Sequence, residues 1–498
     1  MSNLPLSSGV ANAVIPQGHP RGLYTLFLTE MWERFSYYGM RALLVLFLVD
    51  ATRGGQGMSK SVATAIYGLY TAGAYLAALP GGWVADRFLG AQRSVLYGGI
   101  LIAIGQFTLA FAPGNTIYLG LVLGVLGTGL LKPNVSAIVG DLYPEGGARR
   151  DAGFTIFYMG INLGAMLGPL IASYLGENKK LNWNYGFAAA GVGMVLGLIQ
   201  FRLSAKHLGE CGRHPGRREG ATRMDWLLLG GFVGAIILVV ALAWSGILRI
   251  NPLALAQDAT YVIVSVALVF FGCSFLLFGL DGTEKKRLAV IAVLFVSSAM
   301  FWSGFEQAGS SLNLFAKDYT QRIFGGFEIP AGWFQSVNPV FIISLAPLVA
   351  MVWMSLARRN RDLTLTTKFA LGLGLLAMGF IVMAAASKLV GDGRKVWPTW
   401  LIATYLFHSL GELCLSPVGL SSVTKLAPRR LVGQMMGIWF LATSLGNLIA
   451  GLVAGQVSTD SASQMSARYL QIVFMALGVG GLLLVFTKPI KSLMKDVK

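Results

Sequence analysis

The segment TEMWERFSYYGMRALLVLFLVD, residues 29–50, decides the fold of this chain. Its length and apolar content are those of a membrane-spanning helix, because about 20 mostly apolar residues cross a bilayer. Yet the segment contains Glu30, Glu33, Arg34 and Arg41. A charged side chain at the centre of a bilayer costs roughly 3 kcal/mol on the insertion scale. These four side chains must therefore face water or protein rather than lipid.

The composition of the whole chain also indicates an integral membrane protein. Its 498 residues are 55% hydrophobic and 12% charged, with a mean hydropathy of +0.65, whereas soluble domains have about 25% charged residues. We identify fourteen apolar segments of spanning length between residues 22 and 487. The N-terminus lacks the basic start and short apolar core of a signal peptide, so we expect the first span to be uncleaved. The three cysteines, far apart in sequence, predict neither a disulfide framework nor a zinc site.

The basic residues predict the orientation of the chain in the membrane. The net charge is +17, and most of the 39 Lys and Arg fall in loops on the side of the two termini when successive loops are assigned to alternate sides. Positively charged loops stay in the cytoplasm, so we expect cytoplasmic termini and a location in the cytoplasmic (inner) membrane. Nucleic-acid binding would need a basic surface on a folded soluble domain, and no segment is typical of such a domain.

Twelve of the predicted spans fall into two sets of six. The seventh and eighth spans have no ionisable group in their interiors, and without them the pattern is that of two bundles around a central cavity. The first and fourth helices of each set carry charge. In the first set these are the segment quoted above and the helix with Lys132; in the second set they are the helices with Glu306 and Glu412. This coincidence favours a transporter. We predict an N-terminal tail, a six-helix bundle, a cytoplasmic loop with two inserted helices, a second six-helix bundle and a C-terminal tail, at residues 1–21, 22–203, 204–287, 288–488 and 489–498, respectively.

The polar residues of the first span share one face of a helix. They follow i, i+3, i+4, i+7, i+8 and i+11 spacing, which is that of a single stripe, and they are Glu30, Glu33, Arg34, Tyr37, Tyr38 and Arg41. The tyrosines alone would fit ordinary packing, but beside four charges they favour a face directed into a cavity. Lys132 lies nearer the cytoplasmic end of its span, where snorkelling to the interface is the alternative.

The segment YLFHSLGELCLSPVGL, residues 405–420, places His408 and Glu412 one helical turn apart. Ser416 precedes Pro417, which predicts a kink that frees a backbone carbonyl. A His–Glu pair can relay a proton. We favour the simpler interpretation, a histidine that is hydrogen-bonded within the bundle.

Several segments resemble the proton-coupled oligopeptide transporters of the major facilitator superfamily. EMWERFSYYG (30–39) is similar to a signature of that family, and the other matching blocks are GGWVADRFLGAQRSVLYGG (81–99), GTGLLKPNVSAIVGDLY (127–143), FTIFYMGINLGAMLGPLIA (154–172), FWSGFEQAGSSL (301–312), QSVNPVFIISLAP (335–347) and GELCLSPVGLSSVTKLAP (411–428). The resemblance extends in order over about residues 20 to 490. It implies an all-α polytopic membrane protein with the major facilitator fold, in which two six-helix bundles and two extra helices make 14 transmembrane helices.

The resemblance implies a symporter that imports di- and tripeptides with protons by alternating access. It implies that Arg41 and Lys132 bind the peptide carboxylate and that Glu412 binds the amino terminus. The other substrate-binding positions that it implies are Tyr37, Tyr38, Tyr75, Asn162, Trp302, Asn338, Ser416 and Trp439. A zwitterion needs a cation at one end and an anion at the other, and varied side chains need apolar walls. We expect a monomer in a lipid bilayer, with no metal and no cofactor besides the proton gradient.

The same resemblance implies two ion pairs between the bundles. Arg41 would pair with Glu306 toward the outside and Lys132 with Glu412 toward the inside. Protonation of Glu306 would then release Arg41 to a peptide carboxylate. Glu30 and Glu33, with Arg34 and Lys132 as partners, are the other candidates for proton coupling. Animal members carry a histidine in the second helix, but none of the four histidines lies in the second span here, so we expect carboxylates to carry the proton.

Other functions fit the sequence less well. The near alternative is the same fold with another solute, such as nitrate or a peptide-like drug, and Glu412 favours peptides because it can bind an amino group. Drug export and a passive channel are weaker alternatives. An intramembrane enzyme is not supported, because the chain lacks HExxH, GxSxG and paired aspartates within its spans.

Overall fold

The computed structural model describes residues 18–111, 114, 116–216, 221–361, 363–391, 394–459 and 462–494. Most of the predicted N-terminal tail (1–21) and the end of the predicted C-terminal tail (489–498) lie outside these residues. The described part is almost entirely helical, apart from a short hairpin of β1 (Ile323–Phe324) and β2 (Phe327–Glu328).

The first half of the chain forms one helical bundle. Its helices are α1 (Arg21–Val49), α2 (Lys60–Leu76), which continues through α3 (Ala78–Val84) and η1 (Ala85–Leu89), α4 (Ala91–Phe111), α5 (Thr116–Asp141), α6 (Gly147–Gly176) and α7 (Trp183–Ser204). A short turn of helix, η2 (Ala205–Leu208), follows α7. The next two helices, α8 (Arg223–Trp244) and α9 (Pro252–Leu276), are the inserted pair.

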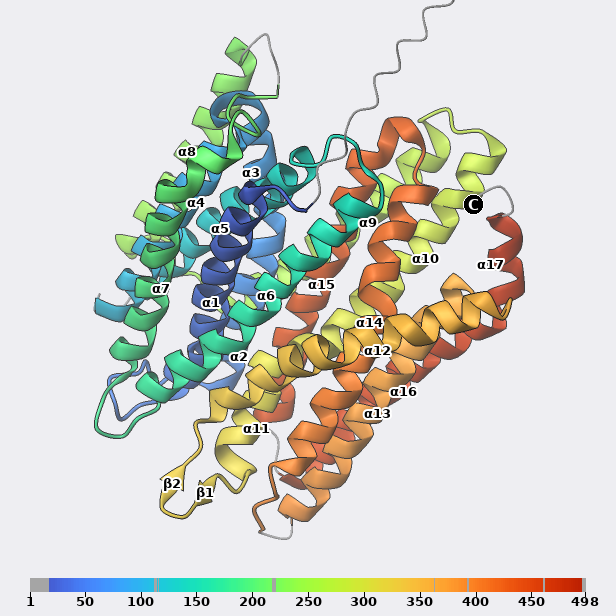
Figure 1. The fold of residues 1–498 in the computed structure, drawn as a ribbon. Coiled ribbons are helices and arrows are strands. Elements are labelled where there is room, and N and C mark those ends of the chain that lie inside the picture. Colours follow the sequence, from blue (N-terminus) through green and yellow to red (C-terminus); the bar gives the residue numbers. More distant parts are fainter. Residues whose placement is uncertain are drawn as a thin grey trace, which may run out of the picture.

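The second half forms the other bundle. It contains α10 (Gly282–Phe305), which continues through η3 (Glu306–Gly309) into α11 (Ser311–Tyr319), then η4 (Ala331–Ser336), α12 (Val337–Arg358), α13 (Leu365–Gly391), α14 (Thr399–Leu426), η5 (Arg429–Leu431), α15 (Val432–Thr459), α16 (Ala462–Val485) and α17 (Thr487–Leu493). Figure 1 shows the two bundles side by side, the first mostly in blue and teal and the second in yellow to red.

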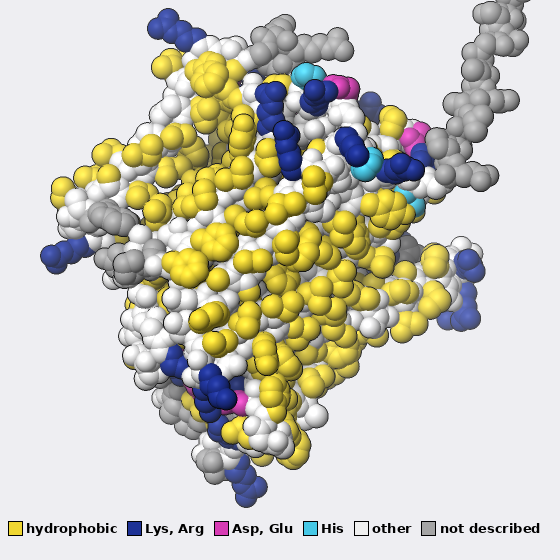
Figure 2. All heavy atoms as spheres, turned by 60° about the vertical axis from the view of Figure 1, so that its left-hand side comes forward, with side chains coloured by type: hydrophobic (Ala, Val, Ile, Leu, Met, Phe, Trp, Pro, Cys, Tyr) yellow, Lys and Arg dark blue, Asp and Glu magenta, His cyan; other side chains and the backbone are white. Residues whose placement is uncertain are grey.

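Within the described residues, 13 helical segments are long and apolar enough to cross a membrane. Helix α1 is not among them, although its 29 residues are sufficient, because it carries the charges discussed above. These 13 segments and α1 together confirm the prediction of an all-α protein with two six-helix bundles and two inserted helices. Figure 2 shows a broad hydrophobic surface across the middle of one face, with charged side chains gathered toward the ends. This distribution is that of a protein surrounded by lipid.

Local sequence signals explain where several helices begin. Thr222 and Asp225 form a capping box at the start of α8, and Asp281 and Glu284 form another at the start of α10. A capping box satisfies two backbone N–H groups that the first turn leaves unpaired. Because of the box, α10 begins at Gly282, six residues before the predicted bundle start at 288, and its first turn is polar rather than apolar.

Helix α2 of the first bundle and α15 of the second meet closely. A Cβ atom on Gly451 would lie 2.5 Å from the backbone oxygen of Thr64, and one on Gly68 would lie 3.1 Å from the backbone oxygen of Asn447. Glycine at both positions lets the two backbones approach, as small residues do in membrane helix pairs. Helix α9 packs on the outside of this contact through Ala256, Ile263 and other residues, whereas α8 buries almost nothing.

The bundles are joined at the end opposite the chain termini. The Glu177 carboxylate, which follows α6, accepts hydrogen bonds of 2.8 Å from both Ala331 N and Gly332 N at the start of η4. Trp333 Nε1 donates to the backbone oxygen of Leu170 at 2.8 Å. Further pairs across the same end are Lys60–Asp318 at 2.8 Å, Lys179–Glu328 at 2.8 Å and Asn313 Nδ2 to Ala42 O at 2.8 Å. We call this set of contacts the outer closure, after the orientation that the basic loops predict.

Substitution Glu177→Ala should open the outer closure. It removes two hydrogen bonds to a charged group, which contribute about 1.5–3 kcal/mol each. Ala165 lines a cavity between the two bundles. A cysteine introduced there should then react at least about tenfold faster with a membrane-impermeant thiol reagent that is added on the side opposite the termini. The same protein without Ala165→Cys accounts for labelling of the native cysteines.

Glu145→Ala is the matched control for this experiment. Glu145 is an exposed carboxylate at the other end of the first bundle, where it pairs with Arg149 in the same bundle. This substitution should leave the labelling rate unchanged. Equal labelling rates in Glu177→Ala and in the parent protein would show that Glu177 does not hold the bundles together.

Candidate functional site

A cavity of about 250 Å³ lies between the two bundles. Helices of both halves line it, so that a molecule within it would touch both at once. Its size approaches the lower limit of about 300 Å³ for small-molecule sites. The predicted site residues that line it are Glu30, Arg34, Tyr38, Arg41, Tyr75, Lys132, Asn162, Trp302, Glu306, Asn338, Glu412, Ser416 and Trp439. The other two, Glu33 and Tyr37, are buried behind this wall.

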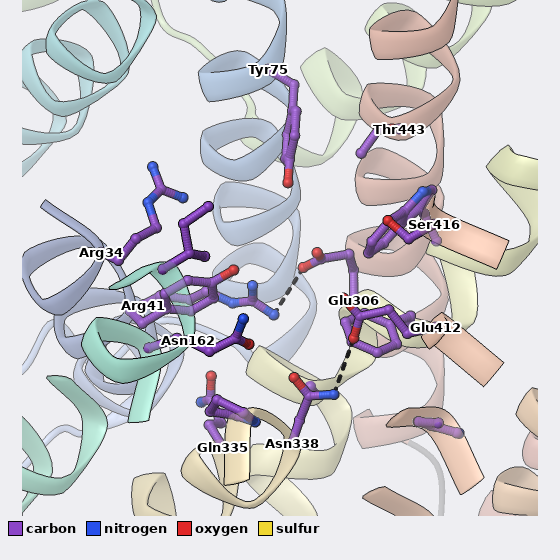
Figure 3. A pocket seen from close by; sticks show the side chains of 18 of the residues that line it. Arg34, Arg41, Tyr75, Asn162, Glu306, Gln335, Asn338, Glu412, Ser416 and Thr443 are labelled. Carbon is purple, nitrogen blue, oxygen red and sulfur yellow. Dashed lines mark hydrogen bonds and ion pairs between the residues drawn. The ribbon is translucent and has the colours of Figure 1, made fainter. Parts of the chain in front are cut away.

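The expected ion pair between Arg41 and Glu306 is present. Arg41 Nη2 lies 2.9 Å from Glu306 Oε2, and both side chains are almost completely buried. Figure 3 shows the two groups reaching toward each other from opposite bundles. Arg41 comes from the middle of α1, and Glu306 comes from the point where α10 changes into η3. Tyr67 Oη donates a longer hydrogen bond of 3.4 Å to the same carboxylate oxygen.

A second charged cluster lies within α1 itself. The Arg34 guanidinium pairs with Glu33, to which Nη2 donates at 2.7 Å, and its Nε lies 3.4 Å from Glu30 Oε1. The other Glu30 oxygen, Oε2, is buried and has no hydrogen-bond partner. One arginine therefore faces two carboxylates, and the trio carries one negative charge when both acids are ionised.

Lys132, on α5, supplies the opposite charge near this trio. Its Nζ lies 3.9 Å from the centre of the Tyr75 ring, a distance at which a cation is attracted to the face of an aromatic ring. In the described part of the chain no carboxylate lies within ion-pair distance of Nζ. The lysine thus remains available to an anion that enters the cavity.

The expected ion pair between Lys132 and Glu412 is not formed in this structure. Glu412 Oε2 instead accepts a hydrogen bond of 3.2 Å from Asn338 Nδ2, which also donates to Ser409 Oγ at 2.9 Å. These three residues belong to the second bundle, and Figure 3 shows the Asn338–Glu412 contact. The physical reason is the position of the outer closure. The contacts between the bundles gather at that end, whereas Lys132 and Glu412 were expected to meet at the other.

His408 is buried within the bundle, as the favoured interpretation expects, but the expected hydrogen bond is not formed with ordinary geometry. Its ring is 1% exposed, and neither ring nitrogen has a hydrogen-bond partner. The ring lies among aromatic side chains, with centroid distances of 4.9 Å to Phe380 and 6.4 Å to Phe305. No ion pair or hydrogen bond joins His408 to Glu412 in the described residues, so this conformation contains no direct proton path between them.

The walls of the cavity differ in chemistry. The first bundle contributes three cations, Arg34, Arg41 and Lys132, and tyrosine hydroxyls. Its one lining carboxylate among the described residues, Glu30, pairs with Arg34, so the cations outnumber the acids on this wall. The second bundle contributes two carboxylates, Glu306 and Glu412, set among aromatic rings. The cavity thus has a cationic wall and a carboxylate wall, and it suits a small solute with both charges and an apolar side chain.

Sequence reasoning missed several lining residues, namely Tyr158, Phe305, Gln335, Tyr405, Phe440 and Thr443. Most are neutral or apolar and carry no signal that separates them from ordinary helix packing. Gln335 stands in the block 335–347, near the end of η4, the turn that leads into α12. No group of three or more His, Cys, Asp or Glu in the searched residues is arranged to hold a metal ion.

Comparisons with known proteins agree over nearly the whole chain. Residues 92–471 match the model of the POT family. The chain is 42% identical to "Peptide transporter YePEPT" of Yersinia enterocolitica subsp. palearctica serotype O:3 (strain YE-P4), over 97% of this chain and 96% of that one. It is 36% identical to the "Di-/tripeptide transporter" of Lactococcus lactis subsp. cremoris, over 97% and 98% of the two chains.

The fold is also found among solved structures. One of them, "Crystal structure of peptide transporter POT in complex with sulfate", superposes with a TM-score of 0.87 at 41% identity. The match covers 96% of this chain and 97% of the other. The inserted helices α8 and α9 therefore lie within the matched length.

Proposed function

The chain belongs to the POT family of transporters, which are not enzymes, and from this premise we propose that it imports di- and tripeptides together with protons. The observation that carries the proposal is the pair of oppositely charged walls in one cavity. A peptide zwitterion presents a carboxylate at one end and an ammonium group at the other, and these walls complement both. The names of its relatives support the same substrate class.

We propose that the two ends of the peptide bind to different bundles. Arg41 and Lys132 would take the carboxylate, and Glu412 would take the amino group, where Asn338 already holds the acceptor oxygen in place. Trp302 and Trp439 would form the apolar walls for the side chains. A substrate bound in this way draws the bundles together, because each bundle holds one end.

Proton coupling is proposed at the Arg41–Glu306 pair. A proton that arrives on Glu306 makes this residue neutral, so Arg41 loses its partner and can bind the peptide carboxylate. The proton on Glu306 and the peptide carboxylate on Arg41 would then replace the ion pair between the two bundles. When Arg41 and Glu306 pair again, the proton leaves on the other side of the membrane. Glu30, with its unpartnered oxygen beside Arg34, is the second candidate for the same proton.

One chain supplies every residue of this cavity, so we propose that a single chain is the transport unit. We also propose that the termini face the cytoplasm, because the basic loops favour that side. The substrate then enters through the outer closure and leaves where the bundles diverge.

Uptake into proteoliposomes tests the proposal. Vesicles that contain the purified protein should accumulate labelled dialanine when the outside is made acidic, and a proton ionophore should abolish the accumulation. Labelled nitrate under the same gradient is the comparison, and it should not accumulate. Accumulation of nitrate but not of dialanine would overturn the proposed substrate. Dialanine accumulation that is unchanged by the ionophore would overturn the proposed proton coupling.

A further inference from the structure

Three amide side chains project into the cavity between its charged walls. Asn162 comes from α6, Gln335 from the end of η4 and Asn338 from the first turn of α12. Figure 3 shows all three near the Arg41–Glu306 and Asn338–Glu412 contacts. Each amide contains one hydrogen-bond acceptor and one NH₂ donor group. The partners of these groups show what each amide still has to offer a ligand.

Asn338 uses both N–H groups of its amide within the protein, and Asn162 uses one of its two. Asn162 Nδ2 donates to the backbone oxygen of Tyr158 at 2.9 Å. Asn338 Nδ2 donates to Ser409 Oγ and to Glu412 Oε2. These contacts fix the orientation of both amides and leave their oxygens as acceptors. A ligand therefore meets two amide oxygens here, which suit an N–H group or an ammonium group.

Gln335 differs from both asparagines. Its side chain is 8% exposed and lines the cavity, yet its Nε2 is buried and has no hydrogen-bond partner. No hydrogen bond within the described residues engages its oxygen either. A buried amide without partners costs about 1–3 kcal/mol. Rotation about the last bond exchanges oxygen and NH₂, and no protein hydrogen bond favours either orientation. Gln335 is thus free to turn its donor toward a ligand.

A peptide has one group that this arrangement leaves unmatched. Its carboxylate and amino group face the charged walls, and its N–H can meet an amide oxygen. The carbonyl oxygen of the peptide bond needs a donor. Gln335 precedes Asn338 by one helical turn, and residues at this spacing lie side by side. The free amide of Gln335 therefore lies next to the place where the peptide's amino group would bind. The first carbonyl of a peptide is only two bonds from its amino nitrogen, so it lies there too.

We infer that Gln335 donates a hydrogen bond to the carbonyl oxygen of the substrate's peptide bond and so selects for a carbonyl between the two charged ends. This inference rests on the proposed function, because it assigns one residue a part in peptide recognition. The inference also explains why the Gln335 amide has no hydrogen-bond partner among the described residues of the protein: the carbonyl oxygen of the substrate would be that partner.

Three zwitterions of equal chain length separate this contact from the others. Glycylglycine has both the carbonyl and the N–H, 5-aminolevulinic acid keeps the carbonyl but has CH₂ in place of N–H, and 5-aminopentanoic acid has neither. Each is tested as a competitor of labelled dialanine uptake in proteoliposomes. In the wild-type protein the two carbonyl compounds should bind more tightly than 5-aminopentanoic acid.

Substitution Gln335→Met keeps the length of the side chain and removes the amide. It should weaken the binding of glycylglycine and 5-aminolevulinic acid by about 2- to 12-fold, the range for a single hydrogen bond, and leave the binding of 5-aminopentanoic acid unchanged. Gln106→Met is the matched control. Gln106 is also buried with an unpaired amide atom, but it lies on α4 and outside the cavity, so its loss should alter none of the three.

Equal weakening of all three compounds in Gln335→Met, or no weakening at all, would overturn the inference. Gln335→Asn provides a second measurement if the methionine variant does not fold, because it keeps an amide but shortens its reach. It should weaken only the two carbonyl compounds, and equal effects on all three would again contradict the role. A wild-type protein that binds none of the three would instead refute the proposed function.

Discussion

Glu306→Gln should abolish the proton-driven accumulation of dialanine and leave the exchange of peptide between the two sides of the membrane intact. Glutamine is neutral and has nearly the shape of a protonated glutamate, so it mimics one state of the carboxyl group permanently. Arg41 then lacks its charged partner at 2.9 Å and remains available to the peptide carboxylate. Binding and the movement of loaded protein persist, but no proton accompanies the peptide.

The expected size of the effect follows from the driving force. Each pH unit contributes 1.36 kcal/mol per coupled proton, so a gradient of two units supports roughly 100-fold accumulation with one proton. The variant should approach equal concentrations inside and outside. Proteoliposomes are measured in two ways, by net uptake under a gradient and by counterflow of labelled against unlabelled dialanine without one.

Glu284→Gln serves as the control on the same helix. Glu284 lies in the first turn of α10, outside the cavity, where it belongs to the capping box. Its loss should cost some stability of the helix but not the coupling. A Glu306→Gln protein that still accumulates dialanine like the wild type would move the proton to another carboxylate, and Glu30 is the next to test.

Glu412→Gln should weaken the binding of dialanine by about 10- to 150-fold. A hydrogen bond to a charged group contributes about 1.5–3 kcal/mol, and every 1.4 kcal/mol is a factor of ten. The variant keeps the shape of the residue and a polar contact to Asn338, so the loss arises from the missing charge opposite the peptide's ammonium group. Binding is measured by competition with a labelled substrate or by the thermal shift of the purified protein.

N-acetyl-dialanine provides the internal comparison for this variant. It has the same carboxylate, peptide bond and methyl groups but no ammonium group. Wild-type protein should bind it far more weakly than dialanine, whereas Glu412→Gln should bind the two about equally. If the variant still preferred the free amine by the wild-type ratio, the amino group would bind elsewhere, and Glu306 would be the remaining carboxylate on that wall.

Much of the fold could be predicted because it depends on periodicity and length. The polar stripe on α1 shows plainly in the sequence, and the structure buries Glu33 and Arg34 as this spacing requires. Apolar runs located the inserted helices as well. The starts of helices were less accurate. Helix α9 begins at Pro252 after an Asn cap, and its first two turns are mixed in polarity, so an apolar run does not mark this start.

The parts of the site that escaped prediction depend on conformation or on neutral groups. Lys132 and Glu412 both line the cavity, but whether they meet depends on which end of the bundles is closed, and a list of residues does not specify that. Glu177 was overlooked because a carboxylate after a helix resembles any loop residue until its two backbone donors are seen. Gln335 has no charge, so only its lack of partners distinguishes it.

The pairing within α1 has a consequence for the synthesis of the protein. Helix α1 is translated before the other helices that the structure describes, so it enters the lipid before any of them can shield it. Arg34 pairs with acids on its own helix, whereas Arg41 has no carboxylate partner among the described residues of α1 and pairs with Glu306 of the second bundle. The partner of Arg41 is translated after the whole first bundle and the inserted helices. Folding in the membrane therefore includes a late step, in which Glu306 of the second bundle pairs with Arg41.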